Sequence, residues 1–203
     1  MKKEKIYRLA ITAILIAIII VMAFTPVGYL KIGLLSITFL TVPIIIGAVS
    51  NGPVVGAILG LTFGLTSFAQ CFGMDAFGTT LMQISPVKTA IMCIIPRILI
   101  GVVCAFVYKG LSKTKLPEPV KFGISALSAP LTNTVCFMGL LVAFFWKTEY
   151  IQGVAQSMGG NNVMKFLIAM VGVNGIVELL VCTALGTLIL IPLTKAVSKY
   201  IVK

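Results

Sequence analysis

Two ionisable residues, Arg97 and Glu178, lie deep inside long apolar stretches of the chain. A charged group at membrane depth is costly, so such a residue is by default a candidate functional residue. The planar guanidinium of Arg97 can bind an anionic group through paired hydrogen bonds, and Glu178 can support Arg97 or accept from a ligand hydroxyl or amide. The alternatives are an ion pair between the two residues, a proton relay, or a contact with a partner.

Two asparagines lie at comparable depth. Asn174 precedes Glu178 by four residues and therefore shares its helix face, and Asn133 lies in another apolar stretch. An amide both donates and accepts hydrogen bonds, as a polar neutral ligand requires. The competing interpretation of both asparagines is hydrogen bonding between helices.

Residues 62–86 combine an apolar helical pattern with a polar row, Thr62, Thr66 and Gln70, at a spacing of four. Polar groups on one stripe of a membrane helix rarely face lipid, because nothing there satisfies their hydrogen bonds. Thr66 and Gln70 are therefore candidate ligand contacts.

The row leads into a glycine-rich loop that holds Asp75, the only aspartate of the protein. Asp75 is a candidate ligand contact or lid residue, although a lone loop carboxylate is usually just solvated. Phe72, with Met74 and Phe77, could form an apolar lid over a site. The alternative is that these aromatic residues pack on helix ends.

The sequence argues against an enzyme. It contains no histidine, and its five cysteines are scattered without a CxxC pair, so we expect neither a metal site nor a cofactor. No phosphate-binding loop and no serine in a nucleophile-elbow motif occur. This chain therefore cannot hydrolyse ATP by itself.

Composition identifies an integral membrane protein. Of its 203 residues 59% are hydrophobic and 10% charged, and the mean hydropathy is +1.13. The net charge of +11 would suggest nucleic acid for a soluble protein. Here most Lys and Arg flank apolar runs, so the expected surroundings are membrane lipids, with no nucleic acid.

The apolar runs predict an all-α protein with six transmembrane helices in a single domain, residues 1–203. Glycine, proline and polar residues between the runs, including 29–38 and 147–162, are interpreted as connections or loops. The predicted helices cover residues 7–25, 39–50, 54–69, 87–108, 122–146 and 163–194.

Basic residues set the predicted orientation. Most Lys and Arg lie in the N-terminal segment, in the linker after the fourth run and in the C-terminal tail. By the positive-inside rule both termini are cytoplasmic, so residues 62–86 open to the outside. Tyr29 falls at the outer boundary, where an aromatic belt explains it.

Small residues mark two helix faces. Ala10, Ala13 and Ala17 lie along the first helix, where a small-xxx-small pair permits close approach of another helix, in this chain or in a partner. Gly56, Gly60 and Gly64 form a row about 200° around the third helix from its polar row, at ~100° per residue. The glycine row should pack against a neighbouring helix.

Together these features resemble the substrate-binding S components of energy-coupling factor (ECF) vitamin transporters. The resemblance rests on the basic N-terminus, the alanine-flanked segment 13–17, the segment 52–60 (Gly-Pro-Val-Val-Gly-Ala-Ile-Leu-Gly), the outer loop and six spans in about 200 residues. Segments 35–40 and 66–75 are most similar to the pantothenate-type subgroup.

The resemblance implies high-affinity capture of a vitamin in an outward-facing pocket capped by loops. It implies docking through Ala13 and Ala17, with Ala10 beside them, onto a transmembrane coupling subunit with two cytoplasmic ATPases. The binding subunit would then topple in the membrane to release its cargo.

Pantothenate has a carboxylate, hydroxyls and an amide, which match Arg97, Asn133, Asn174 and Gln70. If Glu178 saturates Arg97, a neutral vitamin such as riboflavin or a thiamine precursor fits better. Two other classes stay open from the residues: a stand-alone proton-coupled transporter or channel, and a structural membrane protein whose polar rows join helices.

Overall fold

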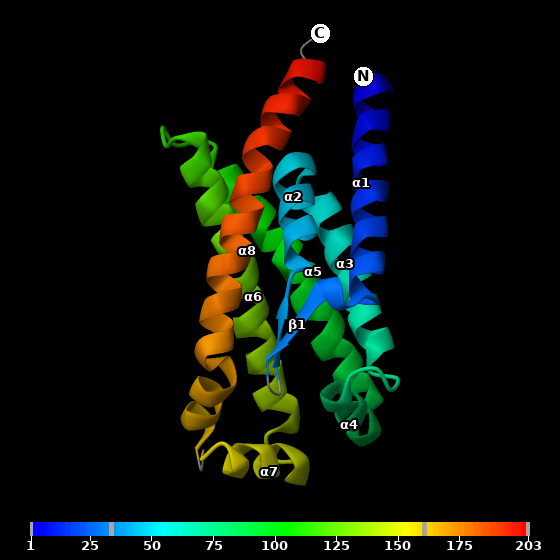
Figure 1. Cartoon of the computed structure of the whole chain (residues 1–203), viewed down its shortest axis with the longest axis vertical. Coiled ribbons are helices and arrows are strands. Elements are labelled where there is room, and N and C mark those ends of the chain that lie inside the picture. The colour runs from blue at the N-terminus through cyan, green and yellow to red at the C-terminus, as the bar shows by residue number, and fades with distance from the viewer. Residues whose placement is uncertain (1, 33–34, 160–161, 202–203) are drawn as a thin grey trace.

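The computed structural model describes residues 2–32, 35–159 and 162–201. Within these ranges it is a helical bundle in which α1 begins and α8 ends at the same end, while α4 and α7 lie at the opposite end (Figure 1). The elements are α1 (Lys2–Ala23), η1 (Pro26–Gly28), β1 (Tyr29–Ile32), β2 (Leu35–Thr38), α2 (Thr41–Asn51), α3 (Pro53–Gln70), α4 (Ala76–Ile84), α5 (Pro86–Leu111), α6 (Glu118–Phe145), α7 (Glu149–Ser157) and α8 (Val163–Ile201).

Five helices of the described chain are long and apolar enough to cross a membrane. The remaining predicted span, residues 39–50, corresponds to α2, which has 11 residues. At ~1.5 Å per residue it extends about 16 Å, short of a ~30 Å hydrocarbon core. All of its residues from Thr41 to Val49 are buried, so α2 is a core helix, and the sixth membrane crossing stays a prediction.

One short two-stranded sheet lies within the otherwise helical chain, where a plain connection was predicted. Strands β1 and β2 pair antiparallel, with Tyr29 opposite Thr38 and Ile32 opposite Leu35. Sequence reasoning treated this segment as a plain connection. Extended backbone inside a membrane bundle must satisfy its own N–H and C=O groups, and pairing the two strands does this locally.

Helices α4 and α7 form where loops were predicted. Asp75 caps α4 by accepting a hydrogen bond on Oδ2 from the Gly78 N–H at 2.8 Å. Thr148 caps α7 in the same way, with Oγ1 accepting from the Ile151 N–H. Each cap satisfies a backbone donor that the first helical turn leaves free, so these short helices begin despite the glycines around them.

Helix α8 is broken rather than continuous. Gly172 has φ 27° and ψ −138°, outside helical geometry. The break separates a short apolar helix, Val163–Gly172, from the candidate membrane span Gly175–Thr194. The two parts of α8 therefore take different directions, which a single predicted span over 163–194 did not anticipate.

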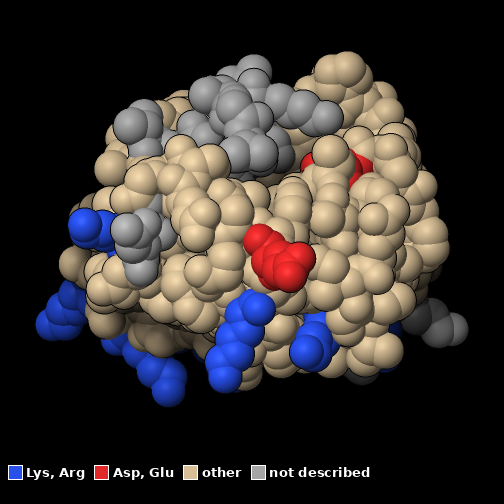
Figure 2. Space-filling model, turned by 90° about the horizontal axis from the view of Figure 1, so that it is seen from below, with Lys and Arg blue, Asp and Glu red and all other residues tan. Residues whose placement is uncertain are grey.

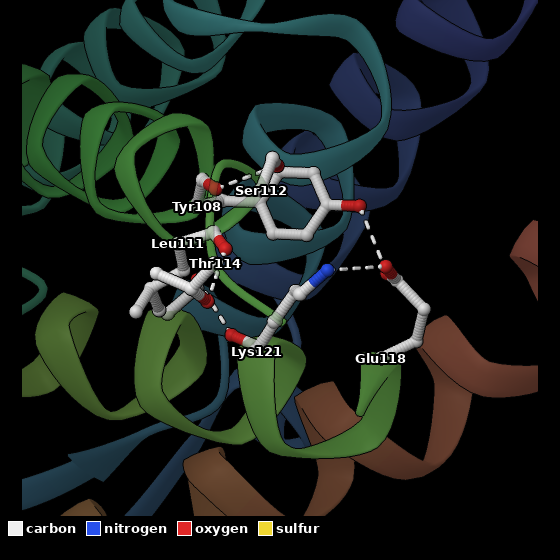
Figure 3. Close-up of polar contacts among 7 residues, drawn as sticks. Tyr108, Leu111, Ser112, Thr114, Glu118 and Lys121 are labelled. Carbon is white, nitrogen blue, oxygen red and sulfur yellow. Dashed lines mark hydrogen bonds and ion pairs between the residues drawn. The ribbon is translucent and has the colours of Figure 1, made fainter. Parts of the chain in front are cut away.

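The turn between α5 and α6 is held by side chains (Figure 3). Lys121 Nζ donates to Glu118 Oε1 at 2.9 Å, and the Tyr108 hydroxyl donates to Glu118 Oε2 at 3.3 Å. The Tyr108 ring also stacks on Phe122, with 5.7 Å between ring centroids. These contacts fasten the two helices across their basic connection.

Helices α3 and α5 touch through their backbones, as the glycine row predicts. An added Cβ at Gly60 would lie 2.2 Å from the carbonyl oxygen of Arg97, and one at Gly56 would lie 2.6 Å from that of Gly101. An added Cβ at Gly64 would lie 2.9 Å from the Cα of Ile94. No side chain fits in this interface, so glycine is required there for steric reasons.

We expect Gly60→Ala to destabilise the protein, because the new methyl group must push α5 and Arg97 away from α3. Overpacking of this kind costs about 1–3 kcal/mol, which a melting curve of the detergent-purified protein would show as a lower Tm. Gly139→Ala in α6 is the matched control, since no neighbour lies within 4 Å of its added Cβ. Equal melting temperatures for the two variants would contradict the close contact.

Candidate functional site

A cavity of about 660 Å³ opens inside the bundle, in the half that contains α4. Its lining comes from the end of α1, both strands, α3, α4, α5, α6 and α8. Its volume is in the usual range of small-molecule sites, roughly 300–1,000 Å³. Viewed from this end, most of the surface is uncharged, with acidic side chains at two places and basic ones gathered along one side (Figure 2).

Arg97 reaches this cavity from α5, where Pro96 precedes it. Proline has no N–H, so Pro96 cannot make the helical hydrogen bond to the carbonyl four residues earlier, that of Met92. The Arg97 side chain uses this carbonyl instead, with Nη1 donating to Met92 O at 3.0 Å. The Pro-Arg pair thus fixes the guanidinium toward the start of α5.

Two aromatic rings hold the guanidinium of Arg97. Its Cζ lies 5.3 Å from the ring centroid of Phe63 on α3 and 4.9 Å from that of Phe137 on α6. Such cation–π contacts compensate part of the cost of removing the charge from water.

Arg97 and Glu178 both line the cavity, yet they form no ion pair within 4.0 Å in this described part of the chain. The arrangement differs from the ion pair that sequence reasoning left open. The guanidinium therefore keeps hydrogen-bonding capacity that no protein carboxylate uses.

Four polar atoms around the cavity are buried without a hydrogen-bond partner among the described residues: Tyr29 Oη, Arg97 Nε, Asn133 Oδ1 and Glu178 Oε1. Burial raises the pKa of Tyr29 to about 12, so its hydroxyl stays protonated and can donate. The set offers two donors and two acceptors. Because an unsatisfied buried polar atom costs roughly 1–3 kcal/mol, this cluster favours a polar ligand that completes it.

Gln70 and Asp75 also line the cavity, and each has a structural contact. The Gln70 side-chain amide donates from Nε2 to the carbonyl of Ala23, which ties the end of α3 to the end of α1. Asp75 is the cap of α4. Both residues therefore position the rim as well as facing the cavity.

Three predicted residues are not placed in the lining. Thr66 is buried and donates to the Phe63 carbonyl of its own helix at 2.9 Å. Phe72 is 68% exposed and packs edge-on against Phe68, whereas Met74 and Phe77 of the predicted lid do line the cavity. The side chain of Asn174 lies outside the described residues.

Sequence reasoning missed several lining residues. Tyr29 was assigned to an aromatic belt, but the hairpin brings it into the cavity wall. Its neighbour across the sheet, Thr38, lines the cavity as well. Neither residue belongs to a row of polar residues at helical spacing, because a short hairpin and not a helix brings them to the cavity.

Two sulfur atoms also meet at the cavity, those of Cys71 and Cys93, at 3.8 Å. Among the described residues, no group of three or more histidine, cysteine or acidic side chains is placed to hold a metal ion.

Comparison with known proteins agrees with this geometry. The family model for the substrate-specific component of ECF transporters matches residues 7–190. The chain is 30% identical over 214 aligned positions to the pantothenic acid transporter PanT of Lactococcus lactis subsp. cremoris (strain MG1363), covering 97% of this chain and 98% of the relative.

Both matches are transport proteins of the membrane, and the resemblance expected from the sequence is confirmed. The chain is accordingly a multi-pass protein of the plasma membrane. From its site, its helices and these matches together, it follows that the chain belongs to the substrate-specific components of ECF transporters.

Proposed function

We propose that this protein binds pantothenate with high affinity and is the substrate-specific subunit through which an ATP-driven ECF importer takes it up. The observation that carries the proposal is the partly buried guanidinium of Arg97, which lines the cavity and has no carboxylate of the described residues within ion-pair distance. Pantothenate supplies a carboxylate. The relative from Lactococcus lactis, named as a pantothenic acid transporter, supports the same ligand.

In this proposal, the ligand carboxylate binds Arg97. Hydroxyls and the amide of the ligand meet the remaining unsatisfied atoms, those of Asn133, Glu178 and Tyr29, with Gln70 and Asp75 at the rim. Asn174, four residues before Glu178 in the sequence, is proposed as a further ligand contact on the same helix face. Thr66 and Phe72 act indirectly, through the packing of α3 and of the turn that follows it.

We further propose six membrane crossings within one transmembrane domain, residues 1–203, with both termini in the cytoplasm. The basic segments near the ends of α1, α5 and α8 support this orientation through the positive-inside rule. The cavity then faces the outside, where the vitamin is captured. Energy comes from a transmembrane coupling subunit and two cytoplasmic ATPases.

Calorimetry with pantothenate and pantothenol tests the proposed ligand. Pantothenol replaces the carboxylate with an alcohol, so the wild-type protein should bind it far more weakly. Arg97→Ala should weaken pantothenate binding roughly 10- to 100-fold, because a hydrogen bond to a charged group contributes about 1.5–3 kcal/mol. The variant should also lose most of the discrimination between the two ligands.

Lys88→Ala is the control for net charge, because Lys88 is an exposed cation of the same helix outside the cavity lining. It should bind pantothenate as the wild type does. Binding of riboflavin or a thiamine precursor in place of pantothenate would refute the ligand assignment. Uptake by proteoliposomes that lack the ATPases would refute the coupling to ATP hydrolysis.

Pro96 should affect pantothenate affinity through the orientation of the Arg97 side chain. Pro96→Ala restores a backbone N–H that competes for the Met92 carbonyl, so the guanidinium loses its fixed partner. We expect pantothenate affinity to fall roughly fivefold, the effect of about 1 kcal/mol, although alanine is the better helix former.

Pro192→Ala in α8 is the matched control, since Pro192 also lies inside a helix but not in the cavity lining. Its pantothenate affinity should be unchanged. A normal affinity for Pro96→Ala would show that the Met92 carbonyl does not orient Arg97.

The small-residue face of α1 is the proposed docking surface. Ala10, Ala13 and Ala17 are all exposed in the structure. Ala13→Trp should prevent co-purification with the coupling subunit and leave pantothenate affinity unchanged, because a bulky ring blocks close helix approach.

Ile18→Trp serves as the comparison. Ile18 is 40% exposed and lies about 100° around the helix from Ala17. A tryptophan ring at position 18 therefore points away from the alanine face. The complex should survive this change. Intact complex with Ala13→Trp would remove docking from the alanine face.

A further inference from the structure

Cys71 and Cys93 form a close thiol pair in the cavity wall. Their sulfur atoms lie 3.8 Å apart, and each residue is 4% exposed. Cys71 follows the last residue of α3, and Cys93 lies in the second turn of α5. Both thiols are free and both line the cavity, so a small reagent that enters the cavity meets them together.

The pair lies beside the helix at the cavity rim. An added Cβ at Gly78 of α4 would lie 2.6 Å from Cys71 Sγ and 2.9 Å from Asp75 Oδ2. The first turn of α4 therefore packs directly on the Cys71 sulfur. Residues 72–75, the turn between α3 and α4, begin immediately after this cysteine.

Two other buried cysteines lack these features. Cys104 donates to the carbonyl of Ser125 at 3.2 Å, and Cys182 donates to that of Thr38 at 3.3 Å. Neither lines the cavity. They act as hydrogen-bonded packing residues and serve as internal controls.

We propose that Cys71 and Cys93 are a modification site, a dithiol that a small thiol oxidant converts to a disulfide, and that this bond slows ligand exchange by fastening the α3–α4 turn to α5. The two sulfur atoms must approach from 3.8 Å to about 2.05 Å. Rotation of both side chains, with a small shift of the turn, provides this movement. The part on ligand exchange rests on the proposed function.

The reaction balances with an azodicarboxamide such as diamide as the oxidant. One thiol adds across the N=N bond, forming an S–N bond and placing its proton on the other nitrogen. The second thiolate attacks the bound sulfur, so the S–S bond forms and the S–N bond breaks. The leaving nitrogen takes up the second proton, and the azo compound is reduced to a hydrazine while two thiols become one disulfide.

The test uses the full-length purified protein treated with diamide. Remaining thiols are then blocked with N-ethylmaleimide in denaturant, and the protein is digested and mapped by mass spectrometry. We expect two of the five cysteines to escape alkylation and to map as a Cys71–Cys93 bond that a phosphine reverses. No bond, or a bond between other cysteines, would overturn the proposal.

Variants check the assignment without depending on ligand. Cys71→Ser and Cys93→Ser should abolish the protected pair, whereas Cys104→Ser and Cys182→Ser should retain it. Diamide should raise the Tm of the wild-type protein but not that of Cys71→Ser. Because the wild-type map needs no variant, a poorly folding substitution does not affect the conclusion.

Ligand exchange is measured by chasing bound radiolabelled pantothenate with excess unlabelled ligand. Oxidation should slow release on the order of tenfold, since a fastened rim opens less often. An unchanged rate in the oxidised protein would overturn the effect on exchange. Failure of the reduced protein to bind pantothenate would refute the proposed function instead, and the disulfide map would stand independently.

Discussion

The site depends on the backbone contact between α3 and α5. Because Gly56, Gly60 and Gly64 lack side chains, α5 approaches α3 closely enough for the Arg97 carbonyl to rest against Gly60. The same contact sets how far the Arg97 side chain reaches, and it puts Phe63 of α3 beside the guanidinium. A charge held this way needs no neighbouring carboxylate to stay in place.

The cavity is a region where stability is given up for binding. The bundle has two apolar cores, one packed around α2 and one formed by α4, α5, α6, α7 and α8. A further apolar side chain in place of Arg97 or Glu178 would remove the cost of burying these charges. Their unsatisfied atoms are instead consistent with a protein in which a bound ligand supplies the missing hydrogen bonds.

The sequence predicts the bundle far better than the cavity. Hydropathy and proline positions locate the long helices within a few residues, because lipid burial requires long apolar runs. The glycine row also predicts that α3 packs closely against a neighbouring helix, and the structure shows that this helix is α5. Arg97 and Glu178 could be selected as candidate site residues because a charged side chain at membrane depth is costly to bury.

The remaining site residues could not be read from periodicity. Thr66 belongs to a convincing polar row, yet its hydroxyl is satisfied by its own helix. Tyr29 and Thr38 come to the cavity through a hairpin whose short strands resemble a loop in sequence. Asp75 was interpreted as a loop residue that contacts the ligand, belongs to a lid or is solvated. Its carboxylate instead caps the first turn of α4, by accepting a hydrogen bond from the Gly78 N–H.

Elements from distant parts of the sequence meet at the cavity. Its polar atoms come from the hairpin, α5, α6 and α8, and the Gln70 contact adds the end of α1. A ligand that completes these hydrogen bonds connects all of them at once, so its binding energy is shared among elements that otherwise meet only at their packing surfaces. Gly172 breaks α8 within the lining, with Met170 and Val171 on the short Val163–Gly172 helix and Glu178 on the longer part, so a ligand in the cavity would contact both parts of α8.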